Sequence, residues 1–211
     1  GEVVTAVRSV RERSMKMRVE VKAGLALVHA EVVLENAAQR PAEVRYRLAW
    51  PDYAALASLE VCNAAGCRQG APEERDVPTI YDDAIRARGP LASSSMLPVA
   101  YARATRDERG TCLVVRAAPV AEQQPLTLRI VFVTQAPVHA GVVRLRLPAR
   151  GMDPLASVTE ISLEPSGLAT ARVDRQPALS GAARVEPWLP IAIEASLDAQ
   201  SGARVALVVR Q

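Results

Sequence analysis

The sequence is poor in aromatic residues and in histidine, and this shortage argues against nucleic-acid binding. Only seven of the 211 residues are aromatic. Proteins that hold single strands stack bases on aromatic rings set among basic side chains, but the densest basic stretch, RSVRERSMKMR at residues 8–18, contains no aromatic residue. The net charge is +3, from 26 basic and 23 acidic side chains. We therefore expect no nucleic-acid partner.

Recognisable catalytic and cofactor motifs are missing as well. His29 falls on the polar face of an expected strand and His139 in an expected turn, and neither belongs to a nucleophile–base–orienter motif. Asp82 and Asp83 are neighbours on an expected helix, where consecutive side chains point about 100° apart. We interpret them as helix-end residues rather than as an acid–base pair. The sequence also has no glycine-rich phosphate loop, so we expect no enzymatic activity, no cofactor and no metal.

Long hydrophobic runs are absent too. No run approaches the ~20 apolar residues of a membrane-spanning helix, so no transmembrane segment is expected. The chain begins with Gly1 rather than with methionine, which we interpret as a trimmed chain or as a mature chain that has lost a targeting segment. Arginine supplies 24 of the 26 basic residues, and together with the abundant alanine this suggests a GC-rich bacterial source.

Cysteine is scarce but placed in an informative way. Asn63 and Gly66, between Cys62 and Cys67, favour a tight turn that would bring the two sulfurs close enough to bond in an oxidising compartment. Two free thiols in a reducing cytosol are the alternative. A zinc site is not expected, because the spacing between the two cysteines is wide and other ligands are distant in sequence. Cys112 is expected to be a small buried hydrophobe.

What the sequence does contain is apolar–polar alternation with a period of two, which predicts β-strands. Turn residues separate the alternating segments, which predicts an antiparallel β-sandwich. Residues 1–150 are expected to form one such sandwich. After a connector punctuated by Pro148, Gly151 and Pro154, residues 151–211 are expected to form a smaller β region packed on it or extending it. The expected strands are 15–22, 26–36, 43–50, 57–62, 111–119, 126–135, 142–150, 157–165, 169–174, 189–197 and 203–211.

One segment, DVPTIYDDAIRARGPL at residues 76–91, breaks this alternation. Thr79 suits a helix N-cap, Asp82 follows three residues later, and Gly89 suits the end. The spacing predicts one short helix over residues 80–88, with an ion pair between Asp82 and Arg86.

So short a helix needs packing to persist, and Tyr81, Ala84 and Ile85 share one stripe that can supply it. We expect the helix to cover an open end or edge of the sandwich. Because segments held on a rigid sheet commonly carry binding, the helix and its flanks are the candidate interaction surface: Tyr81, Asp82, Ile85, Arg86 and Arg88. A sheet edge that accepts a partner's strand is the alternative surface.

The order of these segments resembles the vault protein/inter-alpha-trypsin (VIT) domain. ALVHAEVVLEN ends at Asn36, a turn QRP follows, and VRYRLAWP ends in an aromatic–proline corner at Trp50. IYDDAIRARG then matches the short Tyr-x-x-Ala helix of that family through Tyr81 and Ala84, and LVVRAAP, LTLRIVFV and VRLRLPAR match its later strands. The resemblance implies a non-catalytic β domain, followed by a smaller β region that often precedes a von Willebrand A-type module.

We therefore expect a protein–protein interaction or scaffolding domain of a larger exported bacterial protein, in a cell-envelope or adhesion assembly. Its compartment would be the periplasm or the cell surface, or the cytoplasm if all cysteines are free. The alternative is a β-sandwich that binds a glycan or a lipid, which predicts a deep apolar pocket or exposed aromatic rings. A structural spacer is a third option.

Overall fold

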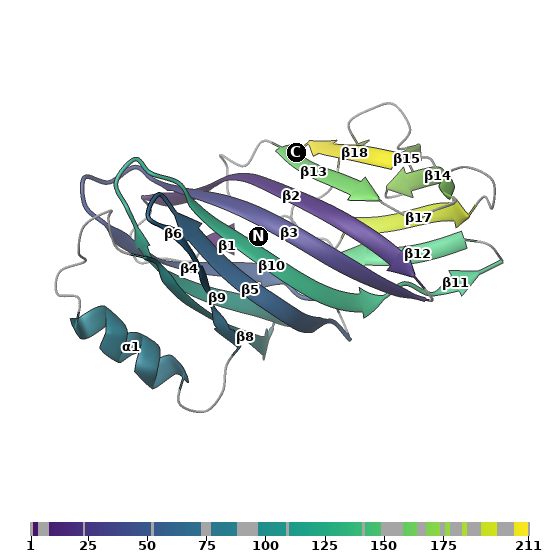
Figure 1. Cartoon of the computed structure of the whole chain (residues 1–211). Helices are drawn as coiled ribbons and strands as arrows, with labels where there is room; N and C mark the ends of the chain where they lie inside the picture. The colour runs from purple at the N-terminus through teal and green to yellow at the C-terminus, as the bar shows by residue number, and fades with distance from the viewer. Residues whose placement is uncertain are drawn as a thin grey trace.

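Within its described part, the chain folds into three β-sheets and one helix (Figure 1). The computed structural model describes residues 2–3, 9–22, 24–51, 53–72, 77–87, 97–108, 110–140 and 142–148. It also describes the backbone of six strands between residues 158 and 210. The mainly β architecture predicted from the alternation is confirmed.

The eight-stranded sheet, here called the large sheet, crosses the whole molecule. Its strand order is β16-β18-β13-β2-β3-β10-β5-β6, and its pairs are antiparallel except β16 with β18 and β13 with β2. The strands are β16 (Ala183–Arg184), β18 (Val205–Arg210), β13 (Val158–Leu163), β2 (Val10–Lys22), β3 (Leu25–Asn36), β10 (Leu126–Gln135), β5 (Ala55–Asn63) and β6 (Gly66–Gln69).

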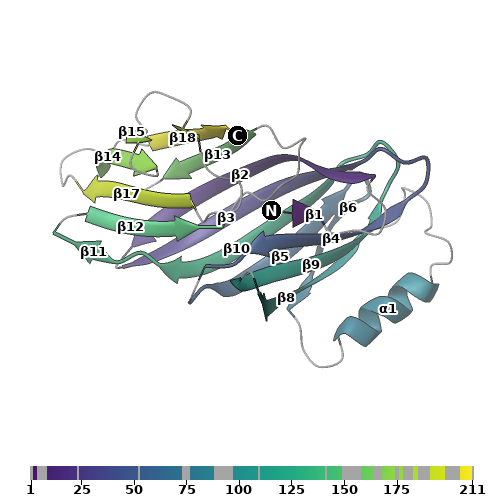
Figure 2. The same ribbon diagram turned by 180° about the vertical axis from the view of Figure 1, so that it is seen from behind.

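A five-stranded sheet, here called the helix-side sheet, lies against one face of the large sheet and is best seen from behind (Figure 2). Its order is β1-β4-β9-β8-β7, antiparallel except for β7 with β8. The strands are β1 (Glu2–Val3), β4 (Ala42–Ala49), β9 (Gly110–Val120), β8 (Val99–Asp107) and β7 (Ala71–Pro72).

The third sheet joins the chain's two predicted regions. Its order is β11-β12-β17-β14-β15, with β11 (Val138–His139), β12 (Val142–Leu147), β17 (Ile191–Leu197), β14 (Leu168–Val173) and β15 (Gln176–Pro177). Strand β12 pairs with β17, and β13 pairs with β2. Strands beyond residue 150 therefore extend sheets begun earlier, while the division into domains at residue 150 stays a prediction.

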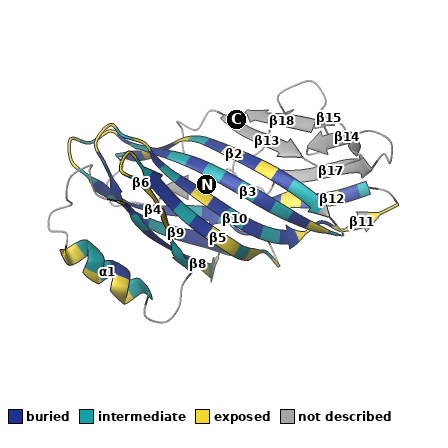
Figure 3. Ribbon diagram, viewed as in Figure 1, coloured by how far each residue is buried: buried dark blue, intermediate teal, exposed yellow. Residues whose placement is uncertain are grey.

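The core lies between the large sheet and the helix-side sheet. The inward positions follow the predicted alternation, and Figure 3 shows buried and less buried residues alternating along these strands. Trp50, just after β4, meets Phe132 of β10 with ring centroids 4.8 Å apart. Aromatic pairs at such separations add packing energy beyond area burial, so this contact ties the two sheets together.

Asn36, the residue that ends β3, is buried and fully engaged with backbone groups. Its side-chain amide donates to the carbonyls of Arg40 and Val120, and its oxygen accepts from the amide of Ala38. A buried polar side chain is tolerated when hydrogen bonds replace water. Asn36 therefore fixes the connector between β3 and β4, which gives it a structural role.

Helix α1 spans Val77–Ala87, three residues earlier at its start than the predicted 80–88. Pro78 lies in its first turn, where a missing amide hydrogen costs nothing. Thr79 is consequently a residue of the helix and not its N-cap, and Asp82 and Asp83 lie in the middle of the helix and not at its end. The predicted Asp82–Arg86 pair is also wrong, because Arg86 contacts Asp83 at 3.2 Å and Asp82 faces the sheet.

Candidate functional site

Helix α1 is anchored to the outer face of the helix-side sheet by one aromatic cluster. Tyr81 is 4% exposed and meets Tyr101 of β8 edge to face, with ring centroids 5.0 Å apart. The guanidinium carbon of Arg116, on β9, lies 4.9 Å from the centre of the Tyr81 ring and 5.7 Å from that of Tyr101. Tyr101 and Arg116 are direct partners in the β8–β9 register. The sheet therefore offers a ready-made platform for the Tyr81 ring.

Charged groups complete this anchor. Arg116 Nε donates to Glu43 Oε1 of β4 at 2.5 Å, and Arg116 Nη1 lies 3.1 Å from Asp82 Oδ1 of the helix. Arg116 Nη1 also donates to the Tyr101 hydroxyl at 3.3 Å. Burial opposes the charged form of Arg116, but the hydrogen bonds to Glu43 and Tyr101 outweigh it and raise its pKa above the ordinary value. One guanidinium thus links three strands and the helix.

Tyr81 is held in its neutral form by the same surroundings. Burial raises the pKa of its hydroxyl well above the usual value, and the negative charge of Glu43 adds to the rise, while Arg116 opposes it. Because the phenol keeps its proton at every physiological pH, Tyr81 is suited to anchoring the helix and not to proton transfer at neutral pH.

The structure divides the predicted interaction surface between two sides of the helix. Tyr81 and Asp82 face the sheet, Ile85 is half-buried, and Arg86 is exposed beside Asp83. Arg88 lies outside the described residues. Ile80 is the large apolar side chain most exposed on the helix, at 64%. Ile80 precedes Tyr81 in the sequence and does not belong to the predicted stripe of Tyr81, Ala84 and Ile85.

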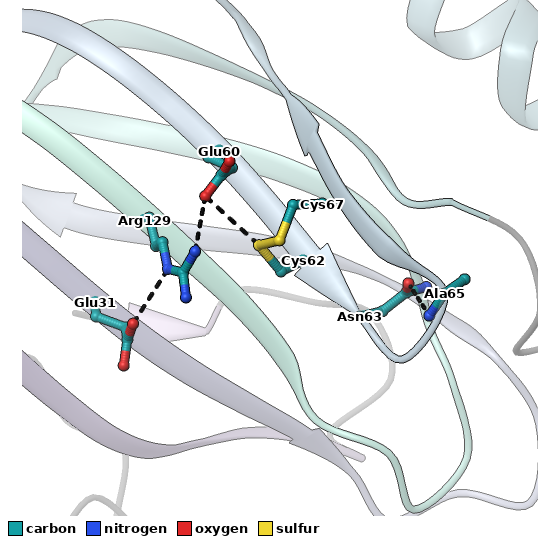
Figure 4. Close-up of a disulfide and its surroundings, with 7 residues drawn as sticks. All are labelled: Glu31, Glu60, Cys62, Asn63, Ala65, Cys67 and Arg129. Atoms are coloured by element: carbon teal, nitrogen blue, oxygen red, sulfur yellow. Dashed lines mark hydrogen bonds and ion pairs between the residues drawn. A yellow bond between two sulfur atoms is a disulfide. The ribbon is translucent and has the colours of Figure 1, made fainter.

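The outer face of the large sheet carries a row of alternating charges. By strand register the row passes through Lys16 of β2, Glu31 of β3, Arg129 of β10 and Glu60 of β5. Arg129 Nε donates to Glu31 Oε2 at 3.2 Å and its Nη1 to Glu60 Oε2 at 3.0 Å, as Figure 4 shows. These bonds to Glu60 and Glu31 raise the pKa of Arg129. The row satisfies its own charges in the manner of a solvated face.

The predicted cysteine pair lies beside this row, in the hairpin of β5 and β6. Cys62 and Cys67 are direct cross-strand partners, and their sulfurs are bonded at 2.09 Å (Figure 4). The turn predicted from Asn63 and Gly66 is present, and Asn63 Oδ1 stabilises it by accepting a hydrogen bond from the amide of Ala65. Cys112 is free and 2% exposed, as expected.

Two depressions open on the described surface. One, of about 250 Å³, lies over the charge row, and its lining includes His29, Glu31, Ser58, Glu60 and Arg129. The other, of about 440 Å³, lies near the start of β2 and the end of β3; its lining includes Ser9, Arg11, Glu12, Arg13, Glu35 and Asn36. Most lining residues of both depressions are charged or polar, although apolar atoms make up the larger part of each lining surface.

Exposed aromatic rings are few among the described residues. Trp50, Tyr46, Tyr81 and Tyr101 are all buried. Tyr53, 81% exposed, is the exception, and Trp188 lies outside the described part.

No family model matches the sequence, and no curated protein matches it. Among solved structures, the chain is similar to a putative nutrient binding protein from Legionella pneumophila, with a TM-score of 0.46 and 11% identity over 95% of this chain and 66% of that one. It is also similar to an M1 zinc metallopeptidase from Deinococcus radiodurans, with a TM-score of 0.41 and 8% identity over 97% of this chain. The chain spans 43% of that peptidase's length.

Over the described ranges, no helix combines the length and apolar character needed to cross a bilayer.

Proposed function

We propose that this chain is a non-catalytic interaction module of a larger exported bacterial protein, and that it binds a protein partner through the outward face of α1. The observation that carries the proposal is that one side of the helix is fixed to the sheet while the other side is exposed. Tyr81 and Asp82 fix it to β8 and β9, while Ile80 is 64% exposed and Arg86 points outward. An apolar residue flanked by charge on a rigid support is typical of a binding surface.

Two further observations support the proposal. The order of segments is similar to that of VIT domains, whose roles are scaffolding and adhesion. The Cys62–Cys67 disulfide is compatible with an oxidising compartment. A neighbouring von Willebrand A-type module is part of the proposal.

The alternative, binding of a glycan or lipid, finds less support. Sugar sites commonly use flat aromatic faces, and four of the five described Trp and Tyr side chains are buried. Arg11, Arg13 and Glu35 are among the lining residues of the larger depression, so it is not the wholly apolar pocket that an acyl chain would favour.

Site-specific photo-crosslinking in the source cells tests the proposal. A photoreactive residue at Ile80 should give one discrete protein adduct, whereas one at Leu25, which is 50% exposed on β3, should not. Arg86→Glu should weaken the Ile80 adduct with only a small change in the melting temperature, because the Arg86–Asp83 pair that it breaks is exposed. No adduct from Ile80, or the same adducts from both positions, contradicts the proposal. A melting-temperature rise with glycans or lipids would then favour the alternative.

A further inference from the structure

The hairpin of β5 and β6 gathers two sulfurs and a carboxylate on one face of the large sheet. Cys62 and Cys67 are cross-strand partners, and Glu60 lies two residues before Cys62 and therefore on the same face. One ligand atom from each of these three residues lies within 4.8 Å of the other two. Figure 4 shows Glu60, Cys62 and Cys67 converging beside Arg129.

We propose that reduction of the Cys62–Cys67 disulfide turns this cluster into a binding site for one thiophilic divalent cation, of which zinc is the model. A dithiol reductant would supply the two electrons and two protons that convert the disulfide to two thiols, and would itself become a disulfide. The cation would then displace both thiol protons, and two thiolates and the Glu60 carboxylate would bind it. This inference does not depend on the proposed interaction role.

The backbone geometry suits such a site. The Cα atoms of Cys62 and Cys67 are 4.0 Å apart, so both side chains leave the sheet side by side. Two thiolates on a tetrahedral zinc ion lie roughly 3.8 Å apart, given Zn–S bonds of ~2.3 Å. Cleavage of the disulfide allows the sulfurs to separate to that distance by side-chain rotation. Cys67 is exposed, so an ion can enter and water can fill the fourth position.

The charges around the hairpin also suit a site for a divalent cation. Two thiolates and one carboxylate around a divalent cation keep one formal negative charge. The guanidinium of Arg129, 3.0 Å from Glu60 Oε2, lies where it can balance that charge. Carboxylate ligands of metals are commonly oriented by such hydrogen bonds. Gln69, the cross-strand partner of Glu60, borders the same face.

Cobalt titration of the whole chain tests the proposal, because thiolate–cobalt bonds give a charge-transfer absorbance that oxygen ligands do not. The protein carries Cys112→Ala, so that the hairpin supplies the only thiols. The protein is reduced with dithiothreitol, the reductant is removed under anaerobic conditions, and the reduced protein is titrated with cobalt. We expect one equivalent of cobalt to develop the band, zinc to displace it, and the oxidised protein to show no band.

Two glutamine variants make the test specific. Glu60→Gln should weaken cobalt binding by tenfold or more, as loss of a ligand does. Glu31→Gln is the matched control: Glu31 also binds Arg129 but lies a strand farther away, so its loss should change the affinity less than threefold. Circular dichroism of the reduced variants establishes that the fold persists.

Three outcomes would overturn the proposal. They are the absence of a thiolate band in the reduced protein, equal cobalt affinities of Glu60→Gln and the parent protein, and a stoichiometry of one ion per two chains. The last result would assign the ion to a bridge between hairpins.

Discussion

The outer face of the helix-side sheet is buried along β9, whereas the outer face of the large sheet stays accessible along its row of charges. On the helix-side sheet the outward residues Cys112, Val114 and Ala118 are at most 4% exposed, and α1 is anchored over Tyr101 and Arg116. On the large sheet the outward row of Lys16, Glu31, Arg129 and Glu60 stays accessible, with Arg129 half-exposed and paired to both neighbouring carboxylates.

The residue types at the outward positions explain the difference. Val114, Cys112 and Ala118 are small or apolar and stay buried, and Tyr101 supplies the ring on which Tyr81 packs. Long side chains of opposite charge on neighbouring strands satisfy each other in water and need no cover. Both sheets alternate with the same period, so the residue types on the outer face, and not the period, distinguish the two sheets.

Among the changes that test this comparison, loss of the Tyr81 ring should lower the free energy of unfolding the most. Tyr81→Ala removes a nearly fully buried ring, and such truncations cost about 3 kcal/mol. Urea unfolding measures the loss. Tyr53→Ala, at an 81% exposed position, is the matched control and should change the unfolding free energy by less than about 0.5 kcal/mol. Equal effects of the two changes would show that α1 is not anchored through Tyr81.

Arg116 and Arg129 each link neighbouring strands, and replacing Arg116, on the helix-side sheet, should cost more stability than replacing Arg129, on the large sheet. Arg116→Met leaves Glu43 and Asp82 without their partner on a mostly covered face, and we expect a loss of about 2 kcal/mol. Arg129→Met breaks two exposed ion pairs and should cost less than about 1 kcal/mol. Both variants are compared by urea unfolding at the same salt concentration. A larger loss for Arg129→Met would reverse the comparison.

The disulfide should stabilise the exposed sheet only modestly. It closes a loop with a sequence separation of 5, for which chain entropy gives at most about 2 kcal/mol. The double change Cys62→Ser and Cys67→Ser should lower the unfolding free energy by no more than that. Thiol counting in denaturant should find one free thiol without reductant and three after reduction. Three free thiols without reductant would refute the bond and weaken the argument for export.

The smallest expected effect is on pH dependence. The pKa of Tyr81 is raised in the folded state, so the stability linked to its proton is complete below about pH 10 and is lost as the pH rises further. One such group lowers the unfolding free energy by about 0.8 kcal/mol between pH 9 and 10.5. Tyr81→Phe should remove that part of the slope, while Tyr53→Phe should not. An unchanged slope in Tyr81→Phe would show that this proton is not linked to folding.

The sequence predicted the sheet class, the disulfide partners and a helix near residue 80, because alternation, turn residues and helix-end residues are local signals. It missed β8, Val99–Asp107. There the buried inward positions are Ala100 and Ala102, the cross-strand partners of Ala117 and Val115. Alanine contributes little to an apolar–polar pattern, so the strand was hidden.

The anchor of α1 could not be predicted at all. Arg116 meets Glu43, Tyr101 and Asp82 because β9 lies between β4 and β8 and the helix packs against β8. Strand order and register set these contacts, and a period of two does not encode them. The predicted Asp82–Arg86 ion pair was wrong for the same reason, because Asp82 pairs with Arg116 on the sheet.

The most direct test of the contrast between the two faces is the rate of thiol alkylation in the native protein. Cys112 reports on the outer face of the helix-side sheet, and the Val131→Cys change, made with Cys112→Ala, reports on that of the large sheet, where Val131 is half-buried. We expect Cys112 to react only as fast as the protein unfolds and the Val131→Cys thiol to react at least a hundredfold faster. Similar rates at the two positions would contradict the account.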